Sequence, residues 1–279
     1  MILVTGATGT IGSHLVRELV RQDELVRAGI HVRPLEFDGV ETCSIDFDQP
    51  ETLPPALEGV DTLFLLSRDV FHEKPMVDAA IEAGVERVVY ISSFNAETDT
   101  FIVGQLHREV EQYIQDSDMI WTILRPNYLM QNFVTIMGEE IRNEDAFYDS
   151  IGDARVSQVD ARDVSQVAAR VITESGHENQ AYELSGPEAL SHHQAAEALS
   201  EALGRRIQYL ELDDETYRRR LLSQGVPEEF AGYLVDVNRR NRKGETDDDK
   251  ITDSVRNILG REPTTFSQFC LDYAPQLGG

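Results

Sequence analysis

A glycine-rich segment near the N-terminus, residues 6–12, constrains the fold of this chain more than any other feature. It follows an apolar run at 2–4 and opens a helical pattern in which Ile11, Leu15 and Leu19 recur. Strand, glycine turn and helix in this order let the backbone approach a pyrophosphate, which the helix N-terminus then attracts. The segment therefore predicts a dinucleotide site. Its expected contacts are Gly6, Thr8, Gly9, Thr10, Ile11 and Gly12, with the Thr5 hydroxyl as an extra donor.

The rest of the first half alternates between short apolar runs and helical patterns. The run at 62–66 is largely apolar, as expected of a parallel strand that is buried on both faces. Such alternation predicts a parallel sheet with right-handed crossovers, which binds ligands outside the carboxyl ends of its strands. We expect strands at 25–30, 41–47, 62–66, 87–91 and 121–124, and helices at 50–57, 76–83 and 103–114.

The pattern changes after Pro126. A further crossover helix is expected at 163–173 and a late strand at 181–184, and Ser191 and Gln194 form a capping box before another helix. The predicted fold class is α/β: a Rossmann doubly wound parallel sheet with a small, mainly helical C-terminal substrate lobe. We assign residues 1–126 and 157–185 to the Rossmann domain, and residues 127–156 and 186–279 to the lobe.

The end of the second strand favours NADP(H) over NAD(H). An NAD site usually has an acidic residue about 20 residues beyond the glycines, whereas an NADP site offers an arginine. Here His31 and Arg33 are expected to meet a 2′-phosphate, although Glu36 and Asp38 would serve NAD if the loop bent back. The other expected cofactor contacts follow later strands: Asp46 and Phe47 for the adenine, Leu66 and Ser67 for the ribose and nicotinamide side, and Ser92 at the nicotinamide.

The chain is strongly acidic, with a formal net charge of −25, and only three of its 25 basic residues are lysines. This charge repels nucleic acid and anionic membranes, so neither is expected as a partner. Acidic, lysine-poor surfaces are similar to those of proteins from halophiles. The sequence has no apolar span and no secretory signal, so we expect a cytoplasmic protein. Cys43 and Cys270 are expected to be buried, inert thiols, and no ligand spacing predicts a metal site.

Seven segments along nearly the whole chain carry a family resemblance through their order and spacing. They are residues 4–12, 56–61, 79–93, 122–128, 160–164, 182–188 and 260–266. Together they resemble the NmrA-like group of atypical short-chain dehydrogenases/reductases, which includes type 2 NADPH:quinone oxidoreductases and triphenylmethane reductase. The resemblance implies an NADP-binding Rossmann domain with a small C-terminal substrate lobe.

One departure from the wider superfamily concerns the helix after the fifth strand. Many short-chain dehydrogenases have a Tyr there with a Lys four residues later, which lowers the tyrosine pKa so that it acts as an acid. Val103 and His107 occupy these two positions here. Direct hydride transfer to a conjugated acceptor needs mainly proximity and orientation, so it fits a chain without the pair. His107, with an unperturbed pKa of about 6.5, is the expected proton donor; the alternatives are orienting the nicotinamide ribose or a structural role.

The residues after the fifth and sixth strands predict where a flat acceptor binds. Ser93, Asn127, Tyr128 and Phe133 are the expected contacts; the alternative for the residues after the sixth strand, and above all for Phe133, is the core between the two domains. We therefore expect an NADPH-dependent oxidoreductase of a quinone-like or other conjugated small molecule, as a monomer or a homodimer. The alternative is a non-catalytic NADP(H)-sensing regulator of the NmrA type. A sugar-nucleotide epimerase or dehydratase is disfavoured because those enzymes use the Tyr and Lys pair.

Overall fold

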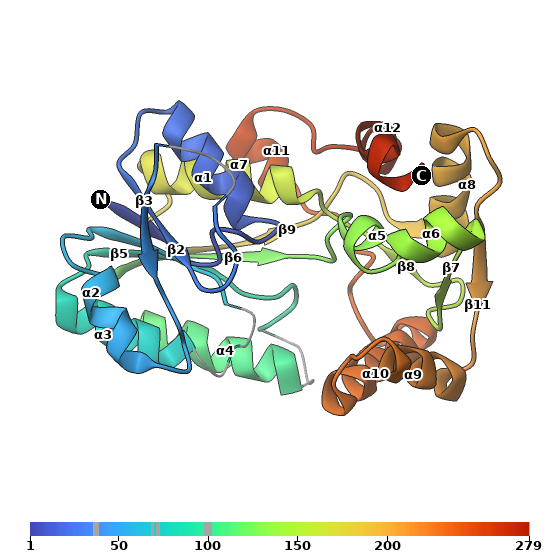
Figure 1. Ribbon diagram of the computed structural model, residues 1–279, viewed down its shortest axis with the longest axis horizontal. Coiled ribbons are helices and arrows are strands. Elements are labelled where there is room, and N and C mark those ends of the chain that lie inside the picture. The colour runs from blue at the N-terminus through green and yellow to red at the C-terminus, as the bar shows by residue number, and fades with distance from the viewer. Residues whose placement is uncertain (36–38, 68–69, 71–72, 98–101, 279) are drawn as a thin grey trace. The chain divides into compact units, whose positions relative to one another are not determined.

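The computed structural model describes residues 1–35, 39–67, 70, 73–97 and 102–278, which form two compact units (Figure 1). The predicted boundaries differ from these units at 157–160 and at 185, which join unit 2, and at 254–261, which join unit 1. The second difference arises because helix α11 (Ser254–Leu259) packs against α7 (Ala161–Thr173). Unit 1 comprises Met1–Pro126, Ala161–Leu184 and Ser254–Arg261, and unit 2 comprises Asn127–Asp160, Ser185–Asp253 and Glu262–Gly279.

Unit 1 has, in its described residues, a seven-stranded sheet in the order β3-β2-β1-β4-β5-β6-β9. All neighbouring strands are parallel. The direction of winding changes between β1 and β4, which is where doubly wound sheets bind ligands. The predicted Rossmann fold class is confirmed. The strands are β1 (Ile2–Val4), β2 (Val26–Ile30), β3 (Glu41–Ser44), β4 (Thr62–Leu65), β5 (Arg87–Ile91), β6 (Ile120–Pro126) and β9 (Gln180–Leu184).

Helices cover both faces of this sheet (Figure 1). Helices α1, α7 and α11 lie on one face, and α2, α3 and α4 lie on the other. Helix α1 forms because Leu15, Val16 and Leu19 fall on one side at helical spacing, and all three are fully buried. The remaining bounds in unit 1 are α1 (Gly12–Arg21), the 3₁₀ turn η1 (Pro50–Thr52), α2 (Leu53–Ala56), α3 (Glu73–Ala83) and α4 (Ile102–Gln115).

Unit 2 is mainly helical, and its described residues also form two small sheets, in which β7 pairs with β11 in parallel and β8 with β10 antiparallel. The predicted capping box is confirmed: the Gln194 N–H donates to Ser191 Oγ at 3.3 Å, and the Gln194 side chain accepts from the Ser191 N–H at 3.0 Å. The elements are α5 (Asn132–Thr135), α6 (Gly138–Glu144), β7 (Ala146–Asp149), β8 (Arg155–Val156), β10 (Leu190–Ser191), α8 (His192–Leu203), β11 (Gln208–Glu211), α9 (Asp214–Ser223), α10 (Glu228–Lys243) and α12 (Phe266–Leu277).

The two cysteines are free thiols in different settings. Cys43 is half-buried in β3 and Cys270 is buried in α12. Burial raises the pKa of Cys270 to about 12 and also raises the pKa of Cys43. Both thiols are therefore protonated at neutral pH, which makes them poor nucleophiles.

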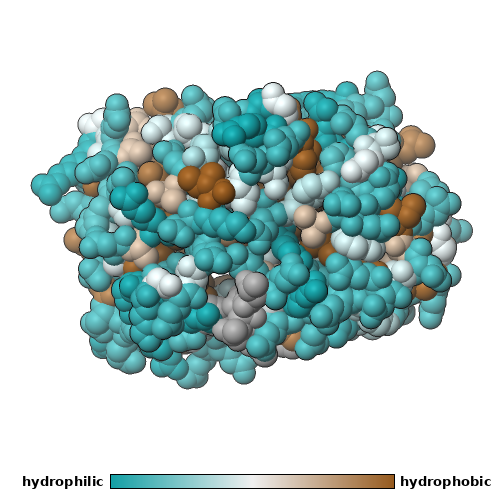
Figure 2. All heavy atoms as spheres, turned by 180° about the vertical axis from the view of Figure 1, so that it is seen from behind, coloured by the Kyte–Doolittle hydropathy of each residue, from teal (hydrophilic) through white to brown (hydrophobic). Residues whose placement is uncertain are grey.

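The surface is predominantly polar on the face drawn in Figure 2, where hydrophobic residues are scattered. Within the described ranges, no helix combines the length and the apolar character that crossing a membrane requires.

Two ionisable side chains are buried in the core of unit 2. Asp149, at the end of β7, accepts hydrogen bonds from the Asn238 amide and, at 2.6 Å, from the Ser150 N–H. Burial raises the pKa of Asp149 to about 7, although these bonds act in the opposite direction. The Nε2 atom of His192 lies 3.6 Å from Asp149 Oδ2, and burial lowers the pKa of His192 to about 4. Burial therefore favours the uncharged form of both groups in this core.

Replacing Asp149 with Asn should make stability less dependent on pH. The native carboxyl has a pKa of about 7 and the unfolded one about 3.9, so wild type loses stability as the pH rises between these values. The free energy of unfolding of Asp149→Asn, relative to wild type, should rise by up to roughly 4 kcal/mol across this window and then level off. Denaturant titrations across the window measure it. The exposed Asp118→Asn is the control, and a difference for Asp149→Asn that ignores pH would contradict the prediction.

Candidate functional site

The turn between β1 and α1 places its three glycines where side chains would collide with the backbone. Gly6 has a φ of +61°, and a Cβ there would lie 3.0 Å from the Leu66 carbonyl oxygen. A Cβ would lie 3.1 Å from the Gly6 carbonyl oxygen if added to Gly9, and 2.2 Å from it if added to Gly12. The glycines therefore allow a tight turn, which we call the cradle, that side chains would disrupt, and they let α1 begin directly against it.

The start of α1 suits an anion. Its first turn has no acidic residue, and Ile11 supplies no side-chain cap. The N–H groups of Thr10, Ile11 and Gly12 have no acceptor in the part of the chain that the structure describes. Free amides at the positive end of a helix bind phosphate oxygens. The residues present therefore fit the pyrophosphate of a dinucleotide.

Thr5 does not contribute a donor to this cradle. Its fully buried hydroxyl donates to the Leu66 carbonyl oxygen at 2.9 Å and accepts from the Leu66 N–H at 2.8 Å. The prediction of a phosphate contact from Thr5 is wrong, because this side chain ties the exit of β1 to the exit of β4. Thr8 and Thr10 lie half-exposed on the turn itself.

The residues after β2 present positive charge to solvent. His31 and Arg33 are exposed, and the Arg33 guanidinium has no partner among the described residues. The His31 Nδ1 atom lies 3.8 Å from Asp46 Oδ1. The two acidic residues that could instead serve NAD, Glu36 and Asp38, lie outside the described residues. The described end of this loop therefore offers the cation that a 2′-phosphate needs.

The predicted adenine contacts lie on the turn after β3. The Asp46 carboxylate accepts from the Asp48 N–H at 3.0 Å and from the Gln49 amide at 2.7 Å, so it stabilises the turn. Phe47 is half-buried and packs on the core of unit 1. Leu66, predicted for the ribose side, is half-buried against the glycine turn.

A chain of hydrogen bonds connects the residues that follow β4 with β5 and α4. Ser67 Oγ donates to Glu73 Oε1 at 3.0 Å, and the Tyr90 hydroxyl donates to Glu73 Oε2 at 2.5 Å. The Tyr90 hydroxyl also lies 2.6 Å from His107 Nδ1. Ser67 and His107 were predicted site residues, but sequence reasoning missed Glu73 and Tyr90. The one signal in the sequence that could have indicated Tyr90 was its hydroxyl within the buried strand β5.

His107 does not have an ordinary imidazole pKa. Burial lowers its pKa to about 4 and outweighs the opposite effect of Glu111. The expectation of a pKa near 6.5 is wrong, because the fold partly buries this position of α4 and so disfavours the charged imidazole. At pH 7 the His107 imidazole is therefore predominantly neutral. A role for His107 must therefore be that of a neutral imidazole.

Ser92 takes part in a second buried network. The centre of this network is Glu111, which lies one helical turn after His107 on α4. The Ser92 hydroxyl donates to Glu111 Oε1 at 2.6 Å, and Arg125 binds the same carboxylate through two nitrogens at 2.7 and 2.8 Å. Burial opposes ionisation of Glu111, but the bonds from Arg125, Ser92 and Arg108 outweigh it and lower the pKa. The Ser92 hydroxyl is thus committed to this network. Its neighbour Ser93 is half-exposed.

The candidate acceptor residues in unit 2 have three different settings. The buried Asn127 amide donates to Ser157 Oγ at 2.9 Å and to the Asp248 carbonyl oxygen at 2.8 Å, so it has a structural role. Phe133 is 1% exposed and packs against other core aromatics such as Phe147, with 5.3 Å between ring centroids. The prediction of a substrate contact from Phe133 is wrong, because the aromatic side chains of unit 2 enclose it.

Tyr128 differs from these two residues. It is half-buried, and its hydroxyl has no hydrogen-bond partner among the described residues. Burial raises its pKa, and the nearby carboxylate of Asp248 adds to this effect. Tyr128 is therefore a neutral phenol with an uncommitted polar end.

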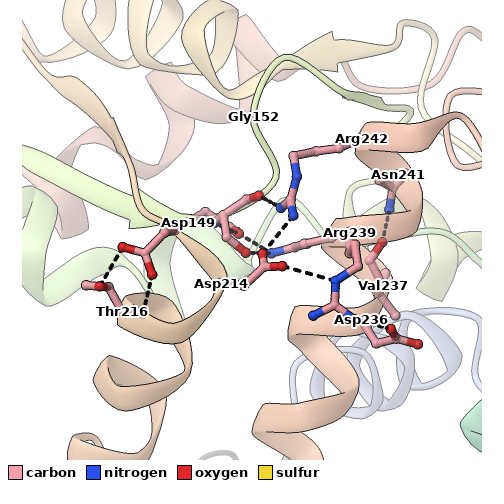
Figure 3. A network of polar contacts seen from close by, with 12 residues as sticks. Asp149, Gly152, Asp214, Thr216, Asp236, Val237, Arg239, Asn241 and Arg242 are labelled. Carbon is pink, nitrogen blue, oxygen red and sulfur yellow. Dashed lines mark hydrogen bonds and ion pairs between the residues drawn. The ribbon is translucent and has the colours of Figure 1, made fainter.

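A cavity of about 590 Å³ in unit 2 was not foreseen from the sequence. Its lining includes Gly152, Arg155, Glu211 and Arg242. Figure 3 shows Arg242 beside Asp214, to which its guanidinium donates at 2.7 Å. Ligand sites for flat conjugated molecules are mostly apolar, so this polar lining does not suit such an acceptor.

The Gly12→Ala substitution should disrupt the turn. The new methyl group would lie 2.2 Å from the Gly6 carbonyl oxygen, so the backbone must shift, at a cost of roughly 1–3 kcal/mol of stability. A tenfold or larger loss of NADPH affinity should accompany this shift. Denaturant titration and fluorescence titration with NADPH measure the two effects. Gly232→Ala is the matched control, because open space surrounds that helical position; unchanged NADPH affinity in Gly12→Ala would argue against the cradle.

Comparisons with known proteins agree with this geometry. The NAD(P)H azoreductase of Xenophilus azovorans is 36% identical, over 100% of this chain and 99% of its own length. The crystal structure of NADPH-dependent quinone oxidoreductase from Escherichia coli, complexed with NADPH, has a TM-score of 0.83 and 28% identity, covering 97% of this chain and 98% of that one. Citrobacter triphenylmethane reductase complexed with NADP(H) has a TM-score of 0.84 and 27% identity, covering 98% of this chain and 100% of that one. The NmrA-like family matches residues 1–270, and the chain belongs to that family.

Proposed function

We propose that this protein transfers hydride from NADPH directly to a flat, conjugated small-molecule acceptor such as a quinone or an azo dye. It is an NADPH-dependent oxidoreductase, and its cofactor is NADP(H). The observation that carries the proposal is the glycine turn. The Gly12 backbone approaches the Gly6 carbonyl oxygen closely there, and the N–H groups of residues 10–12 have no acceptor among the described residues. The named relatives act on an azo compound, a quinone and a triphenylmethane dye, which share extended conjugation.

The order of the strands indicates which end of the cofactor lies at which strand. Strands β2, β1, β4 and β5 are consecutive neighbours, so their carboxyl ends form one edge. We assign the 2′-phosphate to His31 and Arg33 after β2, and the pyrophosphate to the amides at the start of α1. The nicotinamide half then extends past Leu66 and Ser67 toward the residues that follow β5. When bound there, NADPH supplies the hydride.

The proton that completes the reduction comes from solvent in this proposal. A quinone that accepts a hydride and one proton becomes a hydroquinone, and the negative charge formed before protonation is spread over the conjugated ring. His107 is unsuited to supply this proton because its pKa is about 4. We retain His107 as a residue that binds the nucleotide. This role replaces that of proton donor, which was expected of His107 from the sequence.

On the acceptor side, Tyr128 of unit 2 is the contact that we retain. Tyr128 offers a phenol ring together with an uncommitted hydroxyl, and Asn127 supports the backbone beside it by accepting the Tyr128 N–H at 2.8 Å. We further infer that the protein works in the cytoplasm of a halophile, because the net charge of −25 needs salt to screen its self-repulsion.

Removing the Arg33 guanidinium should weaken NADPH binding selectively. A charged hydrogen bond to the 2′-phosphate contributes about 1.5–3 kcal/mol, so Arg33→Ala should bind NADPH roughly 10- to 100-fold more weakly and NADH about as before. Titration with both cofactors measures the ratio. The exposed Arg21→Ala in the same unit is the control. Equal losses for NADPH and NADH would refute the assignment of Arg33.

NADPH oxidation should depend on the acceptor's conjugation and on Tyr128. Wild type should turn over quinones and azo dyes but not simple ketones, and Tyr128→Ala should raise the acceptor KM about tenfold while leaving the NADPH KM unchanged, since the ring provides apolar contact. Tyr113→Ala, on the surface of unit 1, is the control. Tight NADPH binding without turnover of any acceptor would favour the NADP(H)-sensing regulator instead.

A further inference from the structure

The Glu73–Tyr90–His107 chain has a direction that its donors and acceptors determine. Glu73 is 1% exposed, and its carboxylate accepts from both Ser67 and Tyr90. It is also the first residue of α3, where the positive helix end favours a negative charge. The Glu73 carboxyl group is therefore the acceptor in both of these hydrogen bonds.

The phenol of Tyr90 has one hydrogen, which it donates in a hydrogen bond to Glu73. The distance of 2.5 Å between Tyr90 Oη and Glu73 Oε2 is that of a strong charge-assisted hydrogen bond. The oxygen of Tyr90 can therefore only accept in its contact with His107 Nδ1, at 2.6 Å. The hydrogen in that contact must belong to the imidazole, so Nδ1 is protonated. A neutral imidazole with a protonated Nδ1 has a lone pair on Nε2.

We propose that Glu73 and Tyr90 are positioning residues that hold His107 in its Nδ1–H form, so that Nε2 accepts a hydrogen bond from a hydroxyl of the bound nucleotide. His107 Nε2 has no partner in the described part of the chain, so it is available for this contact. The choice of ligand rests on the proposed function, whereas the assignment of the tautomer does not.

The position of the helix that carries His107 is fixed independently. Glu111 lies one turn further along α4, on the same side, and Arg125 and Ser92 hold its carboxylate. Two buried carboxylates thus act on His107 in different ways. Glu111 fixes where the helix lies, and Glu73, through Tyr90, fixes which ring nitrogen carries the proton.

The tautomer can be measured in the wild-type protein without any ligand. Nitrogen-15 NMR at pH 7 distinguishes protonated from unprotonated ring nitrogens, and His107→Ala assigns the signals among the seven histidines. We expect Nδ1 of His107 to be protonated and Nε2 unprotonated. Tyr90→Phe should shift the ring toward the Nε2–H form, which isolated imidazoles of histidine prefer. Tyr113 lies on the same helix as His107, and its surface hydroxyl donates to Asp78 on α3. Tyr113→Phe removes this hydroxyl and should leave the spectrum unchanged.

Binding of NADP⁺ tests the second half of the proposal. The Nε2 signal of wild type should move on titration with NADP⁺, and Tyr90→Phe should bind NADP⁺ about tenfold more weakly, as expected for one lost hydrogen bond. A wild-type spectrum of the Nε2–H form, or one that Tyr90→Phe leaves unchanged, would overturn the tautomer. An Nε2 signal that ignores NADP⁺ would overturn the nucleotide contact. Failure of the proposed function is a separate result, because it appears as absent turnover while the ligand-free spectrum stays as expected.

Discussion

The close approach of the Gly12 backbone to the Gly6 carbonyl oxygen is the constraint on which the geometry of unit 1 depends. Strand β1 is short and central, so the chain must turn at once and start α1 against its own turn. Other side chains hold this arrangement: Thr5 binds Leu66, and Ser165 Oγ on α7 donates to the Ile11 carbonyl oxygen at 2.9 Å. Contacts within unit 1 therefore hold the cradle in place, and such preorganisation lowers the entropic cost of binding a nucleotide.

Buried carboxylates extend this preorganisation to the edge formed by β4, β5 and β6. A buried charge is costly unless it is fully paired, so each carboxylate dictates the positions of its partners. Glu111 is held by Ser92, Arg108 and Arg125, which binds α4 to the sheet. Glu73 does the same for Tyr90 and through it for His107. The site is rigid because its polar side chains have few alternatives.

The sequence could predict the features of this fold that arise from local patterns. The glycine turn, the parallel strands and the Ser191 capping box each depend on residues close together in the chain. The errors concern properties that depend on distant residues. Thr5 could not be recognised as a clip, because its partner Leu66 lies 61 residues away. Phe133 has the same local pattern in a pocket as in a core, and only the rings packed around it decide between the two.

The pKa of His107 illustrates the same limit and also bears on the chemistry. In sequence it stands at the position where many short-chain dehydrogenases of the wider superfamily have a lysine, which suggests a charged group. In the fold, burial keeps it neutral and Tyr90 occupies its Nδ1 atom. The Tyr90 hydroxyl is no substitute acid, because burial raises its pKa and Glu73 reinforces the effect. An edge with these residues can bind and orient a nicotinamide, but it suits acceptors that stabilise added charge by their own conjugation. The proposed preference for flat conjugated acceptors is therefore consistent with the absence of a suitable acid among these described residues.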